Sequence, residues 1–96
     1  MLESKFQRQL IQELEAIFPE CFIMKNDANT IQGFPDLTIL YRDKWAALEC
    51  KQSANSSHRP NQDYYVDVLN DMSYSRFVYP ENKEEVLDEL QQLFTS

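Results

Sequence analysis

Apolar and polar positions along the chain follow two different spacings, which together predict three helices and four strands. Apolar residues recur every three or four positions, the spacing of a helix with one buried face, in residues 2–18, in residues 60–72 and in a last segment that starts at Glu81 or Asn82. Short apolar runs predict strands at 21–25, 37–41, 45–51 and 75–79. The order helix, three strands, helix, strand, helix indicates an α/β fold with a mixed central sheet flanked by helices.

Two of these elements carry specific expectations about burial. The strand at 21–25 has the composition Cys-Phe-Ile-Met-Lys, which predicts that it is fully or nearly buried. In the helix at 60–72, the residues predicted to face inward are Tyr65, Val66, Leu69 and Met72.

The strands at 37–41 and 45–51 are separated only by the polar break Arg42-Asp43-Lys44, so they predict an antiparallel hairpin. Side chains alternate between the two faces of a strand, and Glu49 and Lys51 therefore point to the same side. The antiparallel return brings them back beside Asp36, which stands just before the first strand of the hairpin. Two acids and one lysine are thus expected to converge.

This convergence has a chemical meaning. Two carboxylates held close together repel each other and have raised pKa values unless a cation lies between them. A hard divalent ion such as Mg²⁺ binds a few carboxylate oxygens and keeps waters for a phosphate substrate. A nearby lysine could stabilise developing negative charge or help to orient and deprotonate a water. The alternative interpretation is a surface strand that ends in a Glu-Lys ion pair. The combination of Gly-x-Pro-Asp with Glu-x-Lys at hairpin distance favours the metal site.

The residues before Asp36 also suggest a specific role. Gly33 is the only glycine in the chain, which indicates a position where a side chain would clash or where φ is positive. Pro35 restricts Phe34 to extended geometry and thereby aims Asp36. An ordinary connecting turn would explain the same residues, and the two interpretations are compatible.

Two further polar residues fall on faces that are predicted to point inward. Glu3 lies within the apolar stripe of the first helix, and the helix dipole explains an acid at a helix start but not its inward direction. We therefore predict that Glu3 is a third acid of the site. Gln62 lies one helical turn before Val66, so its amide needs a partner, which could be a carboxylate, the lysine or a water. Alternatively, Gln62 only starts the helix and its amide reaches solvent.

Four basic residues are candidates for contacts with nucleic acid: Lys5, Lys25, His58 and Arg59. His58 and Arg59 end a polar loop at 52–59 and could contact phosphate. His58 could also be a metal ligand or a general base, or a solvated loop residue without either role.

Length and composition limit the possible classes of protein. Ninety-six residues with 43% hydrophobic content predict one globular domain that spans residues 1–96. The longest apolar runs are about five residues, far short of the ~20 that a membrane span needs, and the acidic amphipathic start does not resemble a signal peptide. Cys21 and Cys50 lack a metal-binding spacing and are expected to be reduced thiols of a cytoplasmic protein, although a single disulfide is an alternative. The net charge of −7 argues against a protein that coats nucleic acid through bulk positive charge.

Three motifs together resemble those of the PD-(D/E)XK nuclease superfamily. They are Ile31-Gln32-Gly33-Phe34-Pro35-Asp36, Leu48-Glu49-Cys50-Lys51 and Arg59-Pro60-Asn61-Gln62. Within this superfamily the chain is most similar to the small stand-alone VRR-NUC type, which is often phage-encoded, and more distantly to the archaeal Holliday junction resolvases. The resemblance implies a restriction-endonuclease-like αβββαβ core, here followed by an extra C-terminal helix.

The resemblance also implies hydrolysis of DNA phosphodiester bonds with Mg²⁺ or Mn²⁺. Asp36 and Glu49 would bind the metal together with the backbone carbonyl of Cys50, and Lys51 would be the catalytic lysine. The hydrolysis would proceed without a covalent intermediate.

Two more positions correspond to residues of the family. Glu3 would be the acid of the first helix, and Gln62 the glutamine at the start of the helix after the lysine. The chain departs from the family pattern in being acidic, and it has no appended recognition domain, which argues against sequence-specific restriction.

These observations leave four interpretations. The leading one is a structure-selective endonuclease of a bacterial or phage-infected cell, acting as a homodimer whose two sites make the two cuts of a four-way junction. The second is a nicking or flap nuclease in a replication or repair complex. The third is a non-catalytic interaction module whose acidic last helix binds a basic partner or mimics DNA. The fourth is a structural α/β domain in which the charged cluster is accidental.

Overall fold

The computed structural model describes all 96 residues, and its elements follow the predicted order. The helices are α1 (Glu3–Ile17), α2 (Pro60–Met72) and α3 (Lys83–Thr95). The strands are β1 (Phe22–Lys25), β2 (Leu37–Tyr41), β3 (Lys44–Cys50) and β4 (Ser75–Val78). Each predicted element is therefore present, with its ends displaced by no more than two residues.

The four strands form one mixed sheet, as predicted. Their order is β1-β2-β3-β4, and only the pair of β3 and β4 is parallel. A tight turn at Arg42 and Asp43 joins β2 to β3, with Tyr41 paired to Lys44. Arg42 has a φ of 57°, the left-handed conformation that such short hairpin turns require. Because β3 and β4 are parallel, the chain must cross over between them, and α2 forms this crossover.

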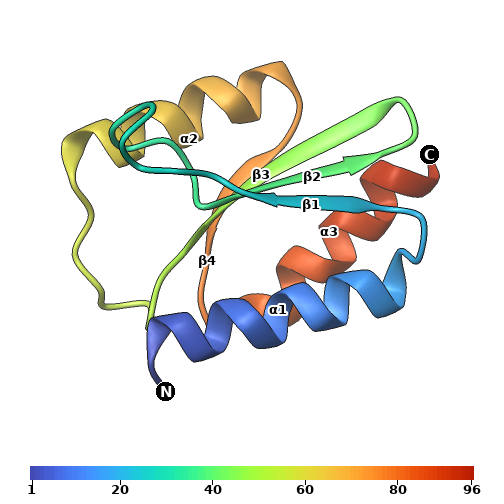
Figure 1. Ribbon diagram of the computed structural model, residues 1–96, viewed down its shortest axis with the longest axis horizontal. Coiled ribbons are helices and arrows are strands. Elements are labelled where there is room, and N and C mark those ends of the chain that lie inside the picture. Colours follow the sequence, from blue (N-terminus) through green and yellow to red (C-terminus); the bar gives the residue numbers. More distant parts are fainter.

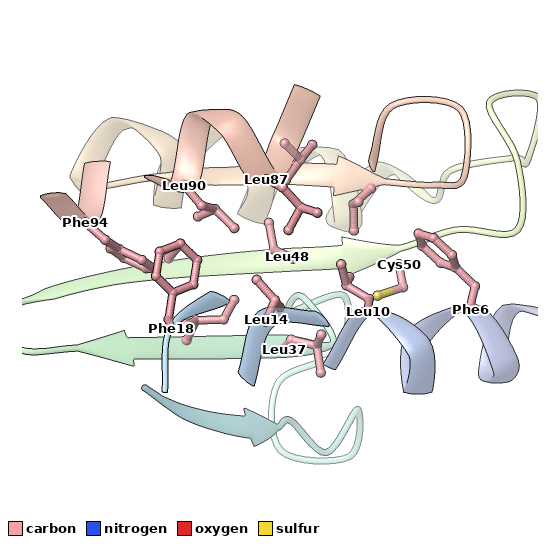
Figure 2. Packing of buried hydrophobic residues seen from close by; sticks show 14 residues of the cluster. Phe6, Leu10, Leu14, Phe18, Leu37, Leu48, Cys50, Leu87, Leu90 and Phe94 are labelled. Carbon is pink, nitrogen blue, oxygen red and sulfur yellow. The ribbon is translucent and has the colours of Figure 1, made fainter. Parts of the chain in front are cut away.

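The helices lie on both faces of the sheet. Figure 1 shows α1 and α3 together on one face and α2 on the other. The main core fills the space between the sheet and the pair α1 and α3, where Leu10 and Leu14 of α1 meet Leu48 of β3 and Leu90 of α3 (Figure 2). All four of these leucines are fully buried. None of the three helices has the length and apolar composition that a membrane span requires.

Successive side chains of β3 point to opposite faces of the sheet, so the residues of β3 divide between the main core and the face that carries α2. Ala46, Leu48 and Cys50 belong to the main core, and Figure 2 shows the Cys50 side chain pointing into it. Glu49 and Lys51 therefore point to the face that carries α2. The thiols of Cys21 and Cys50 are both free.

Two of the expectations about burial are wrong. The side chains of Phe22 and Met24 on β1 are 72% and 53% exposed, because β1 is an edge strand and α2 packs over β3 and β4 instead. Met72 is 68% exposed: it is the last residue of α2, and the buried residues of this helix are Val66 and Leu69.

Candidate active site

The hairpin brings Asp36 and Glu49 side by side. Leu37 pairs with Leu48, so the residue before β2 lies next to the penultimate residue of β3. The backbone N–H of Cys50 donates a hydrogen bond of 2.9 Å to Oδ2 of Asp36. The carboxylate of Asp36 is therefore tied to the strand that carries Glu49. The predicted approach of these two acids is present in the fold.

Lys51 and Gln62 connect this pair of acids to α2. Nζ of Lys51 donates a hydrogen bond of 2.9 Å to Oε1 of Gln62, and Nε2 of Gln62 donates one of 3.2 Å to Oε2 of Glu49. Nζ of Lys51 lies 4.0 Å from the same carboxylate oxygen. The amide of Gln62 thus has both of the side-chain partners that its inward position suggested. The same amide oxygen accepts a hydrogen bond from the N–H of Arg59 at 3.1 Å, so Gln62 also caps α2.

Burial makes the two acids costly to ionise in the metal-free protein. Glu49 is only 5% exposed, and its pKa is raised to about 8, first by burial and then by the negative charge of Asp36, while Lys51 acts in the opposite direction. The pKa of Asp36 is also raised, mainly by burial, against the lowering effects of the Cys50 N–H and of Lys51. One lysine does not compensate for two partly desolvated carboxylates, so the pair favours an additional cation.

Glu3 lies at the edge of this arrangement. It is the first residue of α1 and is largely exposed, yet its pKa is raised by burial and by the charge of Asp36, with Lys51 lowering it. The protein has no group of three or more His, Cys, Asp or Glu side chains that could by itself hold a metal ion. Glu3 therefore contributes charge near the site without joining the two acids in a cluster of three. Its role as a metal ligand stays a prediction.

A cleft of about 450 Å³ opens above the two acids. The loop from residue 28 to residue 34 forms one wall, and the start of α2 forms the other. Its lining residues are mostly polar: Ala28, Asn29, Gln32, Gly33, Phe34, Asp36, Glu49, Arg59, Asn61 and Gln62. The acids are thus accessible to a ligand that enters between the loop and α2.

Gly33 allows these two walls to approach each other. Its φ is +89°, and a Cβ atom at this position would lie 2.6 Å from Cγ of Asn61. Nδ2 of Asn61 donates a hydrogen bond of 3.1 Å to the carbonyl of Gln32. Both reasons for a glycine at this position, a positive φ and a side-chain clash, are therefore confirmed.

The four basic candidates lie in different surroundings. Arg59 lines the cleft, whereas Lys5 and Lys25 are exposed and stand outside its lining. The ring of His58 stacks on Phe77 with 3.8 Å between the centroids, and its Nδ1 lies 3.1 Å from Oδ1 of Asp63. His58 thus packs against β4 and α2, and it is not among the residues that line the cleft. A contact of any of the four with nucleic acid stays a prediction.

The sequence interpretation missed two residues around the cleft. Asn61 joins the start of α2 to the carbonyl before Gly33, and Asn26 bonds the backbone around Asp36. Asn26 lies in a segment interpreted as a turn, and Asn61 lies in the motif at the start of the second helix, where no role was assigned to it. The single glycine next to Pro-Asp was the signal that another part of the chain approaches closely at this point.

Comparison with known proteins identifies the fold. No protein-family model and no curated protein sequence matches this chain. Among solved structures, one described as "VRR_NUC domain protein" has the same fold, with a TM-score of 0.72 at 16% sequence identity. The match covers 99% of this chain and 89% of that one. The restriction-endonuclease-like fold predicted from the three motifs is therefore confirmed over nearly the whole chain.

Proposed function

We propose that this protein is a metal-dependent endonuclease that hydrolyses phosphodiester bonds of DNA. The observation that carries the proposal is the set Asp36, Glu49, Lys51 and Gln62, which comes together from the ends of two strands and from a helix. Asp36, Glu49 and Gln62 line an open polar cleft, and the buried Lys51 is bonded to Gln62. The similarity in fold to a VRR_NUC domain protein supports the same conclusion independently of these side chains.

The donor set fits a hard divalent cation such as Mg²⁺ or Mn²⁺. Asp36 and Glu49 would hold it, with the backbone carbonyl of Cys50 as a further oxygen ligand, and water and phosphate oxygens would complete the shell. The raised pKa values of both acids fit this assignment, because a dication would compensate the two neighbouring negative charges. When bound, such an ion polarises the phosphodiester and supplies a hydroxide at neutral pH.

Lys51 and Gln62 would act on the reacting groups from the α2 side. The ammonium of Lys51 lies close to Glu49 and can stabilise negative charge that develops on the phosphate. Gln62 holds this ammonium and Glu49 in fixed positions through its two hydrogen bonds. Because Gln62 also caps α2, the position of the helix determines the position of the lysine.

The charges around the cleft are more favourable for binding a nucleic acid than the net charge of −7 suggests. α1 and α2 both begin on the side of the molecule where β3 ends (Figure 1), so their positive dipole ends lie near the acids. Arg59 lines the cleft, and we propose that Lys5, Lys25 and His58 extend this contact area along the DNA backbone. The acidic residues Glu84 and Asp88 lie on α3, on the opposite face of the sheet from α2.

We further propose that the substrate is branched DNA and that the protein acts as a homodimer. Phe22, Met24 and Leu40 form an exposed apolar surface on β1 and β2, with side chains 72%, 53% and 38% exposed, and Phe22 is the cross-strand partner of Leu40. β1 is also an open edge of the sheet. A two-fold axis at this surface would place two identical sites at a fixed separation, which suits paired cuts in a four-way junction.

The test is cleavage of a labelled four-way DNA junction, of a nicked duplex, of a flap and of a linear duplex, with Mg²⁺, with Mn²⁺ and with a chelator. We expect metal-dependent paired cuts near the branch point, and a loss of at least about 100-fold in rate for Asp36→Ala and Lys51→Ala. Lys44→Ala is the matched control, because Lys44 begins the strand that Lys51 follows and lies at its other end.

Each result has a different consequence. Equal cutting of junction and duplex would retain the nuclease chemistry and contradict the preference for junctions. Cutting of nicked or flap DNA instead would assign the protein to a different structure-selective nuclease class. If no substrate is cut and folded wild-type protein binds neither metal, the proposal is wrong, and a non-catalytic interaction role replaces it.

A further inference from the structure

Asn26 bonds to the chain on both sides of Asp36, and we propose that it is a positioning residue for this carboxylate. Its Nδ2 donates hydrogen bonds of 2.9 Å to the carbonyl of Pro35 and of 2.9 Å to Oγ1 of Thr38. Its backbone N–H donates a third, of 2.8 Å, to the carbonyl of Asp36 itself. One residue therefore contacts the positions before, at and after the acid.

These bonds are needed because Asp36 lies just outside regular structure. β1 ends at Lys25 and β2 begins at Leu37, so Asp36 is not held by the strand pairing alone. Pro35 is fully buried and has no N–H, and its carbonyl accepts a single hydrogen bond, the one from Asn26. Without Asn26 this carbonyl would be a buried acceptor with no partner, and the turn that carries Asp36 would have to rearrange.

Asn26 and Cys50 hold Asp36 from opposite sides. Asn26, at the end of β1, fixes the backbone of Asp36, whereas the N–H of Cys50, at the end of β3, fixes Oδ2 of its carboxylate. The backbone of Asp36 is thus bonded to the residue that follows β1, and its carboxylate is bonded to the last residue of β3. A substitution at Asn26 keeps this backbone bond but removes the two side-chain bonds to Pro35 and Thr38, and we expect the resulting rearrangement to reach the carboxylate and its hydrogen bond with Cys50.

Only an amide has the required chemistry at this position. The two acceptors, Pro35 O and Thr38 Oγ1, both receive hydrogen atoms from the same nitrogen, and a side-chain NH₂ group provides two donors. An aspartate of nearly the same size would present acceptors to the Pro35 carbonyl and add negative charge beside Asp36. Asn26→Asp therefore removes the hydrogen bond to the Pro35 carbonyl while keeping the volume, even where the Thr38 hydroxyl turns to donate to the aspartate.

The inference that this positioning serves metal binding depends on the proposed function. Partners that orient a metal-binding carboxylate typically change metal affinity by about 10–100-fold when they are removed. The positioning itself can be measured without metal, because the Cys50 amide reports whether the Asp36 carboxylate is in place. These two measurements separate the inference from the proposed function.

The first experiment is amide hydrogen exchange of the metal-free protein, followed by NMR. We expect Asn26→Ala and Asn26→Asp to shift the Cys50 amide resonance and to speed its exchange at least several-fold relative to the rest of β3. Asn70→Ala is the matched control. The side chain of Asn70 also bonds to nearby backbone, since its Oδ1 accepts a 3.1 Å hydrogen bond from the N–H of Ser75. Asn70 lies near the end of α2, whereas Gln62 lies near its start. An unchanged Cys50 amide in both Asn26 variants would overturn the inference.

The second experiment measures Mn²⁺ affinity by electron paramagnetic resonance. We expect Asn26→Ala to weaken binding about 10-fold or more, Asn70→Ala to leave it unchanged, and Asn26→Ala to have no further effect in an Asp36→Asn background. Two results would overturn the role of Asn26 in metal binding. One is an unchanged Mn²⁺ affinity in Asn26→Ala. The other is that Asn26→Ala weakens Mn²⁺ binding as much in the Asp36→Asn background as it does in the wild type. If the wild-type protein binds no Mn²⁺, the proposed function fails, and the Cys50 amide alone decides whether Asn26 positions Asp36.

Discussion

At the scale of single residues, the amide of Gln62 is the centre of the polar network. Its oxygen accepts hydrogen bonds from Lys51 and from the N–H of Arg59, and its nitrogen donates to Glu49. Because these contacts use both ends of the amide, only one orientation of the side chain satisfies all of them. This explains how a buried lysine and a buried carboxylate can lie close together without direct contact at hydrogen-bond distance.

The raised pKa of Glu49 predicts a pH dependence of stability in the metal-free protein. A carboxyl group whose pKa is higher in the folded than in the unfolded state stabilises the fold at low pH, and this contribution is lost as pH rises from about 4.5 toward 8. We expect the free energy of unfolding to fall over this range by at most about 1.4 kcal/mol per pH unit from this group. Urea denaturation with chelator present, at pH 5 and at pH 8, measures it.

The variant Glu49→Gln tests the cause. It cannot ionise, so its loss of stability between pH 5 and pH 8 should be smaller than that of the wild type, with the part due to Asp36 remaining. Asp88→Asn is the control, since Asp88 is exposed and has no hydrogen-bond or ion-pair partner. Equal slopes for wild type and Glu49→Gln would contradict the assignment.

A second residue-scale prediction concerns Gly33. We expect Gly33→Ala to lower the free energy of unfolding by about 1–2 kcal/mol from the positive φ alone, with an additional cost from the contact with Asn61. In an Asn61→Ala background the same change should cost less, because Cγ and Nδ2 of Asn61 are then absent. Urea denaturation of the four proteins gives the difference, and equal costs in both backgrounds would show that the contact is unimportant.

At the scale of elements, the position of each strand in the sheet determines what its side chains do. β3 has neighbours on both sides and helices over both faces, so even its glutamate is buried. β1 has one neighbour and one covered face, and its alternate residues remain at the surface. Apolar side chains thus build the core in β3 and an exposed surface in β1.

The exposed surface of β1 predicts that self-association depends on it. If two copies pair there, Phe22→Ser and Met24→Ser should each weaken the dimer by at least about 10-fold, since each removes a large apolar side chain from the interface. Leu2→Ser is the matched control, because Leu2 is 69% exposed but precedes α1, on the other face of the sheet. Sedimentation equilibrium measures the dissociation constants. A wild-type protein that is monomeric at all concentrations would exclude the proposed dimer.

At the scale of the whole molecule, the site joins parts of the chain that only the complete fold brings together. α1 contributes Glu3 to its edge, the hairpin its two acids and its lysine, and α2 its glutamine. Binding of a ligand to this junction should therefore stabilise the protein as a unit.

We expect saturating Mg²⁺ to raise the melting temperature by on the order of 10 °C at pH 8. The increase should be clearly smaller at pH 5, because protons compete for Glu49 and Asp36, whose pKa values are raised. Differential scanning fluorimetry at constant ionic strength measures both values, with NaCl as the control for salt. Asp36→Asn should abolish the difference. An equal increase at the two pH values would argue against binding through these carboxylates.

The sequence by itself determined the elements, their order and the pairing of Asp36 with Glu49. A hairpin with a tight turn fixes its own register, and alternation fixes the direction of each side chain, so Glu49 and Lys51 could be placed from local information. The inward direction of Gln62 and the need for glycine at position 33 followed from equally local rules.

Only the tertiary structure decided which face of each element was covered and by what. Periodicity gives the direction of a side chain relative to its own helix or strand, but it contains no information about the neighbour that lies there. The exposure of Phe22, the stacking of His58 on Phe77 and the bonds of Asn26 to the chain around Asp36 all depend on segments that are distant in sequence or separated by a loop. These features depend on which segments the assembled layers bring next to one another, and a linear pattern cannot specify those neighbours.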